Sequence, residues 1–169
     1  MPRPDLSKVP EFYHNYISKV SGNNLLNAFH DSTPHFISFL QSIPASKYDY
    51  KYAENKWTLK ELLQHVIDTE RIFCYRALCF ARKDQTPLPG FDEDLYAKTS
   101  KAASRNWDNL VEEFIAVRNA SELLFASFDE EQLNASGLSN NHSNYVLAWG
   151  FITIGHCIHH QQIIEERYL

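Results

Sequence analysis

The stretch Thr58-Leu59-Lys60-Glu61-Leu62-Leu63-Gln64-His65-Val66-Ile67-Asp68 carries the clearest structural signal in this chain of 169 residues. Thr58 followed three residues later by Glu61 is the pattern of a capping box, in which each side chain accepts a hydrogen bond from the other residue's backbone N–H at a helix start. Apolar residues then recur at helical spacing, at Leu62, Val66, Phe73 and Leu78. The stretch therefore predicts a helix that begins at Thr58 and continues to about Arg82.

Three further segments show the same helical period, and none shows the strict alternation that strands need. They run from about Leu25 to Ile43, from about Ala102 to Phe128, and from the end of the turn-rich stretch Gly137–Ser143 to about Arg167. Pro34 could kink the first of them or divide it from a preceding turn. The stretch Asn134–Asn144 is predicted to be a polar loop. Because each amphipathic helix needs a partner for its apolar face, the chain is predicted to be all-α, a single four-helix bundle domain over residues 1–169.

The connection between the second and third helices, from Asp84 to Ser100, is unusually long. Neighbouring antiparallel helices are commonly joined by about two to eight residues. Fully extended, this segment reaches roughly 50 Å, which is enough to cross the bundle and make the second and third helices parallel. Its aromatic residues Phe91 and Tyr96 could cover a pocket, or they could simply anchor a surface loop.

Composition and charge exclude several classes of function. The formal net charge is −5 and the lysines and arginines are scattered, so no basic face for nucleic acid is expected. The N-terminal residues Met1–Asp5 have no apolar core behind them, and the longest weakly polar stretch, Tyr145–Ile158, is too short for a bilayer, so neither a secretory signal nor a membrane span is predicted. The three cysteines form no Cys-x-x-Cys pair, which favours a reducing, cytoplasmic location.

Histidines supply the most informative chemistry. In Ile154-Gly155-His156-Cys157-Ile158-His159-His160, the first and last histidines are one helical turn apart and point from the same face. A third imidazole could come from His65, which lies in the middle of the second helix. Three histidines plus water would form an open site of the catalytic type. The alternative is three bundle histidines that are satisfied separately.

Several motifs together resemble the DinB/YfiT-like superfamily. They are the stretch from Lys56-Trp57-Thr58 to Glu70-Arg71, then Tyr75-Arg76-Ala77-Leu78, Pro87-Leu88-Pro89-Gly90-Phe91-Asp92-Glu93 and Gly155-His156-Cys157-Ile158-His159-His160. The resemblance implies a four-helix bundle with up-down-down-up connectivity, a frequent homodimer and a divalent metal on three histidines. Matched residue by residue, the ligands are His65, His156 and His160. Nickel or zinc is the metal implied first, with manganese and iron as further candidates.

The resemblance also implies a small-molecule substrate and three classes of function. The first is an S-transferase that joins a low-molecular-weight thiol of the bacillithiol or mycothiol type to an electrophile. The second is a metal-dependent hydrolase, in which a metal-bound hydroxide attacks the substrate. The third is a non-catalytic metal-binding module. We rank the transferase first by a small margin that comes from the family alone.

Three further residues are candidates for catalytic roles. Asp68 lies three residues after His65 on the same side of the helix, where it could orient an imidazole, act as a general base or simply form an ion pair. His159 points about 60° away from His156, so it is favoured as a pocket residue or a solvent-facing residue rather than a ligand. Tyr96, in the long connection, could assist a transferase.

Overall fold

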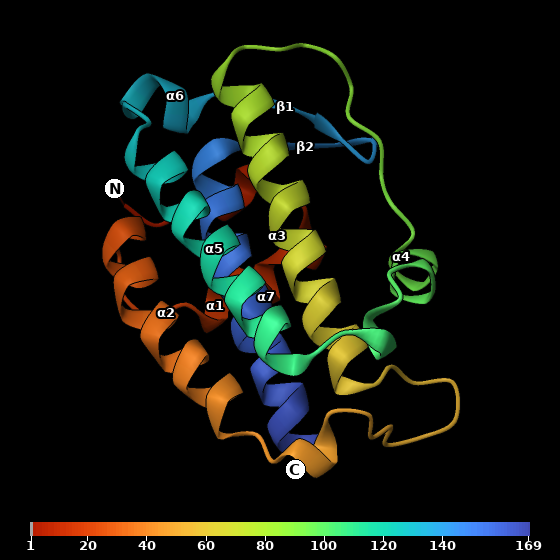
Figure 1. Cartoon of the computed structure of the whole chain (residues 1–169). Coiled ribbons are helices and arrows are strands. Elements are labelled where there is room, and N and C mark those ends of the chain that lie inside the picture. The colour runs from red at the N-terminus through yellow and green to blue at the C-terminus, as the bar shows by residue number, and fades with distance from the viewer. Residues whose placement is uncertain (1) are drawn as a thin grey trace.

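The computed structural model describes residues 2–169 and shows a bundle of four long helices (Figure 1). The long helices are α2 (Leu25–Ser42), α3 (Leu59–Ala81), α5 (Trp107–Ala126) and α7 (Val146–Arg167). The shorter elements are α1 (His14–Lys19), α4 (Glu93–Thr99), α6 (Glu130–Asn134), β1 (Ser136–Ser139) and β2 (His142–Tyr145). The mostly helical bundle agrees with the fold class predicted from the sequence.

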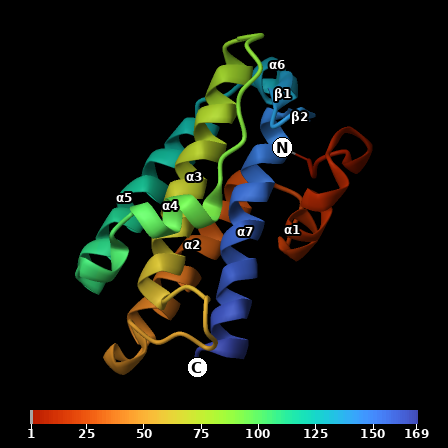
Figure 2. The same ribbon diagram turned by 90° about the vertical axis from the view of Figure 1, so that its right-hand side faces the viewer.

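The directions of the four long helices follow from their colours in Figure 1: α2 runs downward, α3 and α5 run upward, and α7 runs downward. This is the predicted up-down-down-up order seen from the other end. Both α5 and α7 pack against α2 and against α3, so α2 and α3 lie diagonally across the bundle. The long connection descends along the outside of α3 and carries α4, while α1 packs against the outer side of α7 (Figure 2).

The ends of α3 and α5 show how local chemistry decides helix boundaries. The predicted capping box is confirmed: the backbone N–H of Thr58 donates to Glu61 Oε2 at 2.7 Å, and that of Glu61 donates to Thr58 Oγ1 at 3.2 Å. The predicted start of α5 at Ala102 was too early. Lys101 has a left-handed φ of 57° and Arg105 is extended, so residues 102–104 form a separate 3₁₀ turn and α5 begins at Trp107. Pro34 does not divide α2.

The stretch predicted as a polar loop contains a short β-hairpin. β1 and β2 pair antiparallel from Ser136↔Tyr145 to Ser139↔His142, and the two residues between them, Asn140 and Asn141, have φ values of 49° and 63°. Positive φ at both positions is the backbone of a type I′ turn, which asparagine tolerates better than most residues. The hairpin holds the start of the long connection, because Leu88 N–H donates to Leu138 O at 2.9 Å.

The bundle core consists of two apolar clusters with a polar layer between them. One cluster includes Phe29 and Trp149, and the other includes Leu40 and Phe114. Arg118 lies between them, with its guanidinium carbon 5.4 Å from the ring centre of Phe29 and 5.1 Å from that of Phe114. The side chain of Arg118 is fully buried, although arginine is a residue type usually found on the solvated side of a helix. The helical period alone did not distinguish a solvated sector from a buried polar layer.

The polar layer joins all four long helices. Arg118 of α5 donates to both carboxylate oxygens of Glu70 on α3, at 2.9 and 2.7 Å, and to the sulfur of Cys157 on α7 at 2.8 Å. It also donates to Thr33 Oγ1 on α2 at 3.4 Å, and Thr33 donates in turn to Glu122 at 2.6 Å. A bidentate arginine–carboxylate pair that also meets hydrogen-bond partners on the other helices fixes their relative register.

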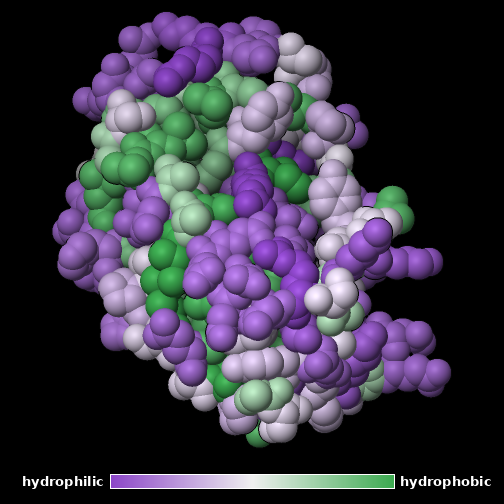
Figure 3. Space-filling view, viewed as in Figure 1, coloured by the Kyte–Doolittle hydropathy of each residue, from purple (hydrophilic) through white to green (hydrophobic). Residues whose placement is uncertain are grey.

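On the face of the molecule seen in Figure 3, polar side chains predominate and apolar side chains gather over the upper part of α5. Leu123 is 74% exposed there and lines a shallow groove with Leu26 of α2 and Ala126 of α5. Among residues 2–169, no helix combines the length and the hydropathy needed to cross a membrane.

We expect Arg118→Met to lower the free energy of unfolding by about 3–5 kcal/mol, because it leaves the buried Glu70 carboxylate without its partner. The double variant Glu70→Leu/Arg118→Met should lose much less than the sum of the two single variants. Urea denaturation of the full double-mutant cycle measures this. Arg71→Met is the control, since its exposed pair with Glu113 should contribute less than about 1 kcal/mol. Equal stability of Arg118→Met and Arg71→Met would contradict the assignment.

Candidate metal centre

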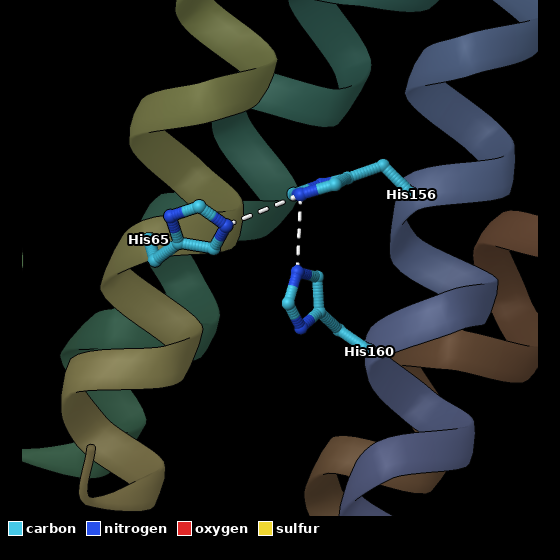
Figure 4. A group of neighbouring side chains, drawn as sticks. All are labelled: His65, His156 and His160. Carbon is cyan, nitrogen blue, oxygen red and sulfur yellow. Dashed lines mark hydrogen bonds between the residues drawn. The ribbon is translucent and has the colours of Figure 1, made fainter. Parts of the chain in front are cut away.

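Three histidine side chains meet between α3 and α7 (Figure 4). His65 projects from α3, and His156 and His160 project from successive turns of α7. Their Nε2 atoms converge: that of His156 lies 3.2 Å from that of His65 and 3.0 Å from that of His160. The side chains are 8%, 5% and 8% exposed, in chain order. The structure thus brings together the three residues that the sequence singled out.

The spacing of these nitrogens fits a shared cation better than hydrogen bonding among the rings. A neutral imidazole nitrogen offers either one N–H or one lone pair, so the Nε2 of His156 cannot satisfy both neighbours. Nitrogens bound about 2.0–2.1 Å from a common ion lie roughly 2.9–3.4 Å apart, depending on the coordination geometry. The two closest separations, 3.0 and 3.2 Å, fall in this range. The donor set therefore fits a divalent metal.

Burial keeps all three imidazoles in the neutral form that metal binding requires. It lowers the pKa of His65 from 6.5 to about 4. The pKa values of His156 and His160 lie well below the ordinary value, first because of burial and then because of the neighbouring imidazoles. Aromatic rings close the surroundings, since Trp57 lies 4.7 Å from His65 and Phe73 lies 5.7 Å from His156, measured between ring centres.

The second ring nitrogens of two ligands have different surroundings. Nδ1 of His65 lies 3.4 Å from Thr69 Oγ1, one turn along α3. Thr69, which the sequence analysis did not single out, is therefore the residue placed to orient this imidazole. Nδ1 of His160 is buried and has no hydrogen-bond partner among the described residues.

A tyrosine from the N-terminal segment completes the wall of the site. Tyr16 on α1 meets His156 and His159 edge to face, with ring centres 5.5 and 5.3 Å apart. Gly155 makes this contact possible, because a Cβ atom at this position would lie 2.0 Å from the backbone oxygen of Tyr16. A glycine inside an otherwise bulky helix was the available signal for such a close approach, but it did not identify the partner.

A cavity of about 260 Å³ lies beside the triad at the end of the bundle where α3 begins. His160 and Trp57 line it, together with Tyr168 near the C-terminus. The exposed residues Lys56 and Asp94 also line this cavity. A larger cavity of about 360 Å³, between α2 and α7, contains none of the three converging histidines.

The three candidate catalytic residues have different surroundings. Asp68 is half-buried, accepts a hydrogen bond from Gln64 at 2.9 Å and lies 3.6 Å from Arg71. Burial raises the pKa of Asp68, and no hydrogen bond within residues 2–169 joins it to a histidine. His159 is half-buried beside Tyr16, and its pKa is lowered chiefly by burial. Tyr96 on α4 is 45% exposed and packs on Phe91, so the catalytic roles of all three remain predictions.

The family model of the DinB superfamily matches residues 28–164. The chain belongs to the DinB superfamily. This match covers α3 and α5 completely, most of α2 and α7, and the three histidines of the triad, whereas α1 lies before its start. The comparison with curated proteins found no match.

Solved structures share the DinB fold at low sequence identity. YfiT from Bacillus subtilis, described as a probable metal-dependent hydrolase with an unusual four-helix bundle topology, superposes with a TM-score of 0.70 at 14% identity and covers 96% of this chain and 89% of its own. The mycothiol-dependent maleylpyruvate isomerase superposes with a TM-score of 0.65 at 14% identity, over 85% of this chain and 59% of the isomerase. At this identity the likeness establishes the fold.

The metal-free protein should lose stability as the pH falls below 6.5, the ordinary pKa of histidine. Below this pH the histidines of the unfolded chain bind protons, whereas the buried imidazoles of the folded chain stay neutral. His65 alone therefore lowers the free energy of unfolding by about 1.4 kcal/mol for each pH unit, until the pH approaches its folded pKa of about 4. Urea denaturation in the presence of a chelator, between roughly pH 4.5 and 6, measures the slope. In His65→Gln the free energy of unfolding should fall less steeply with pH, by about 1.4 kcal/mol per pH unit, because one proton fewer is taken up on unfolding. An unchanged slope would contradict the burial of a neutral His65.

Gly155→Ala should lower the free energy of unfolding by about 2–3 kcal/mol, because the added methyl group meets the backbone of Tyr16 rather than a movable side chain. Thermal or urea denaturation measures the loss. Glu166→Ala, at an exposed position of the same helix, is the control and should change stability by less than about 0.5 kcal/mol. If Gly155→Ala were equally neutral, α1 would not be held against α7 in the way described.

Proposed function

We propose that this DinB-superfamily protein binds one divalent cation through His65, His156 and His160 and uses it in the chemistry of a small molecule. The observation that carries the proposal is the convergence of three buried Nε2 atoms beside a cavity. Three neutral ligands leave the charge of the cation uncompensated and leave at least one position open. A cation held there lowers the pKa of a coordinated water or thiol toward neutrality.

Thiol transfer is the leading reaction in this proposal. None of the three cysteines of the chain belongs to the triad or to the adjoining cavity. Cys157 follows His156 but faces Arg118 and Glu70, and burial raises its pKa to about 12. A thiolate that reacts at this centre must therefore come from a bound low-molecular-weight thiol. The mycothiol dependence of one structural relative supports this ranking.

Hydrolysis is the second candidate, favoured by the description of the other structural relative as a probable metal-dependent hydrolase. In either reaction the protein contributes a dry, preorganised ligand set. Tyr16 and Trp57 pack against the imidazoles and exclude water, and Thr69 is placed to hold the proton on Nδ1 of His65. Asp68 is the proposed general base, and Tyr96 and His159 are proposed to assist.

The proposal includes nickel or zinc as the resident metal, a homodimer and a cytoplasmic location. The choice of metal follows the imidazole ligands, which suit nickel and zinc. The free cysteines fit a reducing compartment. A non-catalytic metal-binding module is the reading that remains if no substrate is turned over.

Untagged protein should contain about one equivalent of metal by elemental analysis, and His65→Ala and His156→Ala should contain none. Free metal at a hundredfold excess over its dissociation constant should add about 2.7 kcal/mol to the stability of the wild type, and a chelator should remove it. His142→Ala is the matched control, because this exposed histidine lies on the hairpin and outside the triad. Wild-type protein that stays metal-free after reconstitution would refute the proposed site.

The loaded protein should then conjugate a thiol to an electrophile when tested with a panel of low-molecular-weight thiols. Conjugation that depends on both thiol and metal, and that is lost in His160→Ala, supports the transferase. Turnover of an ester or amide panel without thiol would instead favour the hydrolase. Tight metal binding with no turnover in either panel would favour the binding module.

A further inference from the structure

One polar atom of the triad is left without a partner by the fold itself. Nδ1 of His160 is buried and meets no hydrogen-bond acceptor or donor in residues 2–169. Figure 4 shows this nitrogen turned away from the other two rings, toward the C-terminal end of α7. A metal-bound histidine almost always donates its other ring N–H to a carboxylate, a carbonyl or water. Buried polar atoms are rarely left unsatisfied, so this one calls for an explanation.

The metal decides what kind of partner is missing. When Nε2 of His160 binds a cation, the neutral ring carries its proton on Nδ1, and this nitrogen becomes a hydrogen-bond donor. The missing partner is therefore an acceptor. A negatively charged acceptor is favoured, because a hydrogen bond to an ionised group is roughly twice as strong as one between neutral groups.

The adjoining cavity supplies a matching environment. His160 lines it, and so does Lys56, whose ammonium group has no ion-pair partner among the described residues. The rings of Trp57 and Tyr168 form apolar walls of the cavity. The Tyr168 hydroxyl donates a hydrogen bond to the backbone oxygen of Trp57 at 2.8 Å, which links the two walls. Asp94 also lines the cavity and opposes negative charge on a ligand, so one carboxylate is tolerated there better than two.

We infer that this cavity binds the carboxylate of a small, largely apolar substrate, with His160 Nδ1–H and the Lys56 ammonium as its two donors. The inference rests on the proposed metal site, because the metal fixes the proton on Nδ1. It identifies the substrate class as monocarboxylic acids with an apolar or aromatic body. The carboxylate then completes the outer hydrogen bonding of a metal ligand, so binding of the acid and binding of the metal assist one another.

The test uses cobalt-loaded protein and two probes of the same shape, phenylacetate and phenylacetamide. Phenylacetate should bind at least about tenfold more tightly by calorimetry, because it alone offers a charged acceptor. It should also bind more tightly to cobalt-loaded than to metal-free protein. The visible spectrum of the cobalt should keep its coordination signature, since the carboxylate lies at Nδ1 of His160 and not on the metal.

Two charge variants test the placement with opposite signs. Lys56→Met should weaken phenylacetate binding about threefold to fivefold, and Asp94→Asn should strengthen it about twofold to threefold. Lys98→Met, at an exposed position of α4 that does not line the cavity, is the matched control and should change nothing.

Each contrary outcome has a distinct meaning. Equal binding of acid and amide, or wild-type affinity in Lys56→Met, overturns the carboxylate site while leaving the metal site intact. A cobalt spectrum that changes as if the carboxylate were a direct ligand overturns the placement at His160. Protein that binds no cobalt overturns the proposed function and this inference together.

Discussion

Arg118 and Glu70 are each 1% exposed in their side chains, and their bidentate contact is the constraint on which the bundle's register depends. Two charges removed from water are tolerated when each meets its partner in good geometry, and shifting either helix by one turn would separate them. The same guanidinium contacts Cys157, the residue after His156. Because α3 and α7 are held by one polar layer next to the histidines, His65 is brought opposite the α7 pair.

The second constraint is the close packing of α1 on α7. Because Gly155 carries no side chain, the backbone of Tyr16 can lie directly against α7 at the residue just before His156. This contact brings a ring edge to two imidazoles from a segment that precedes the family match at residue 28. The triad is thus built on the shared DinB scaffold, whereas part of its wall belongs to a segment outside the matched region.

Local signals were readable from the sequence, and contacts between distant segments were not. The capping box at Thr58 and the one-turn spacing of His156 and His160 are set within a few residues of chain, so their geometry follows from helix rules. His65 was a candidate third imidazole from its place in the middle of its helix, and the family resemblance assigned it to the ligand set. The burial of Arg118 depends on Glu70 from another helix, and the contact of Tyr16 depends on α7. The apolar period within one helix could therefore predict neither of them.

The hairpin and the hydrogen-bond partner of His65 Nδ1 are two further features that the sequence did not predict. The strands are four residues long and mostly polar, so neither alternation nor β-branched content marked them, and the turn residues Asn140 and Asn141 were the one local sign. From its spacing, Asp68 was a candidate to orient an imidazole, to act as a general base or to form an ion pair. It lies 3.6 Å from Arg71, and the residue beside His65 Nδ1 is Thr69. Positions three and four residues ahead on a helix share a face, and rotamers decide between them.

The charge balance around the triad connects the fold to its chemistry. The two carboxylates of α3 that follow His65 are both matched by arginines, Asp68 by Arg71 and Glu70 by Arg118. Three neutral imidazoles add no negative charge. A divalent cation held there would therefore keep its charge, and in a site of low dielectric that charge attracts an anionic ligand more strongly than it would in water. The thiolate and the carboxylate that we propose as ligands would both supply the negative charge that such a cation attracts, one at its open position and the other in the adjoining cavity.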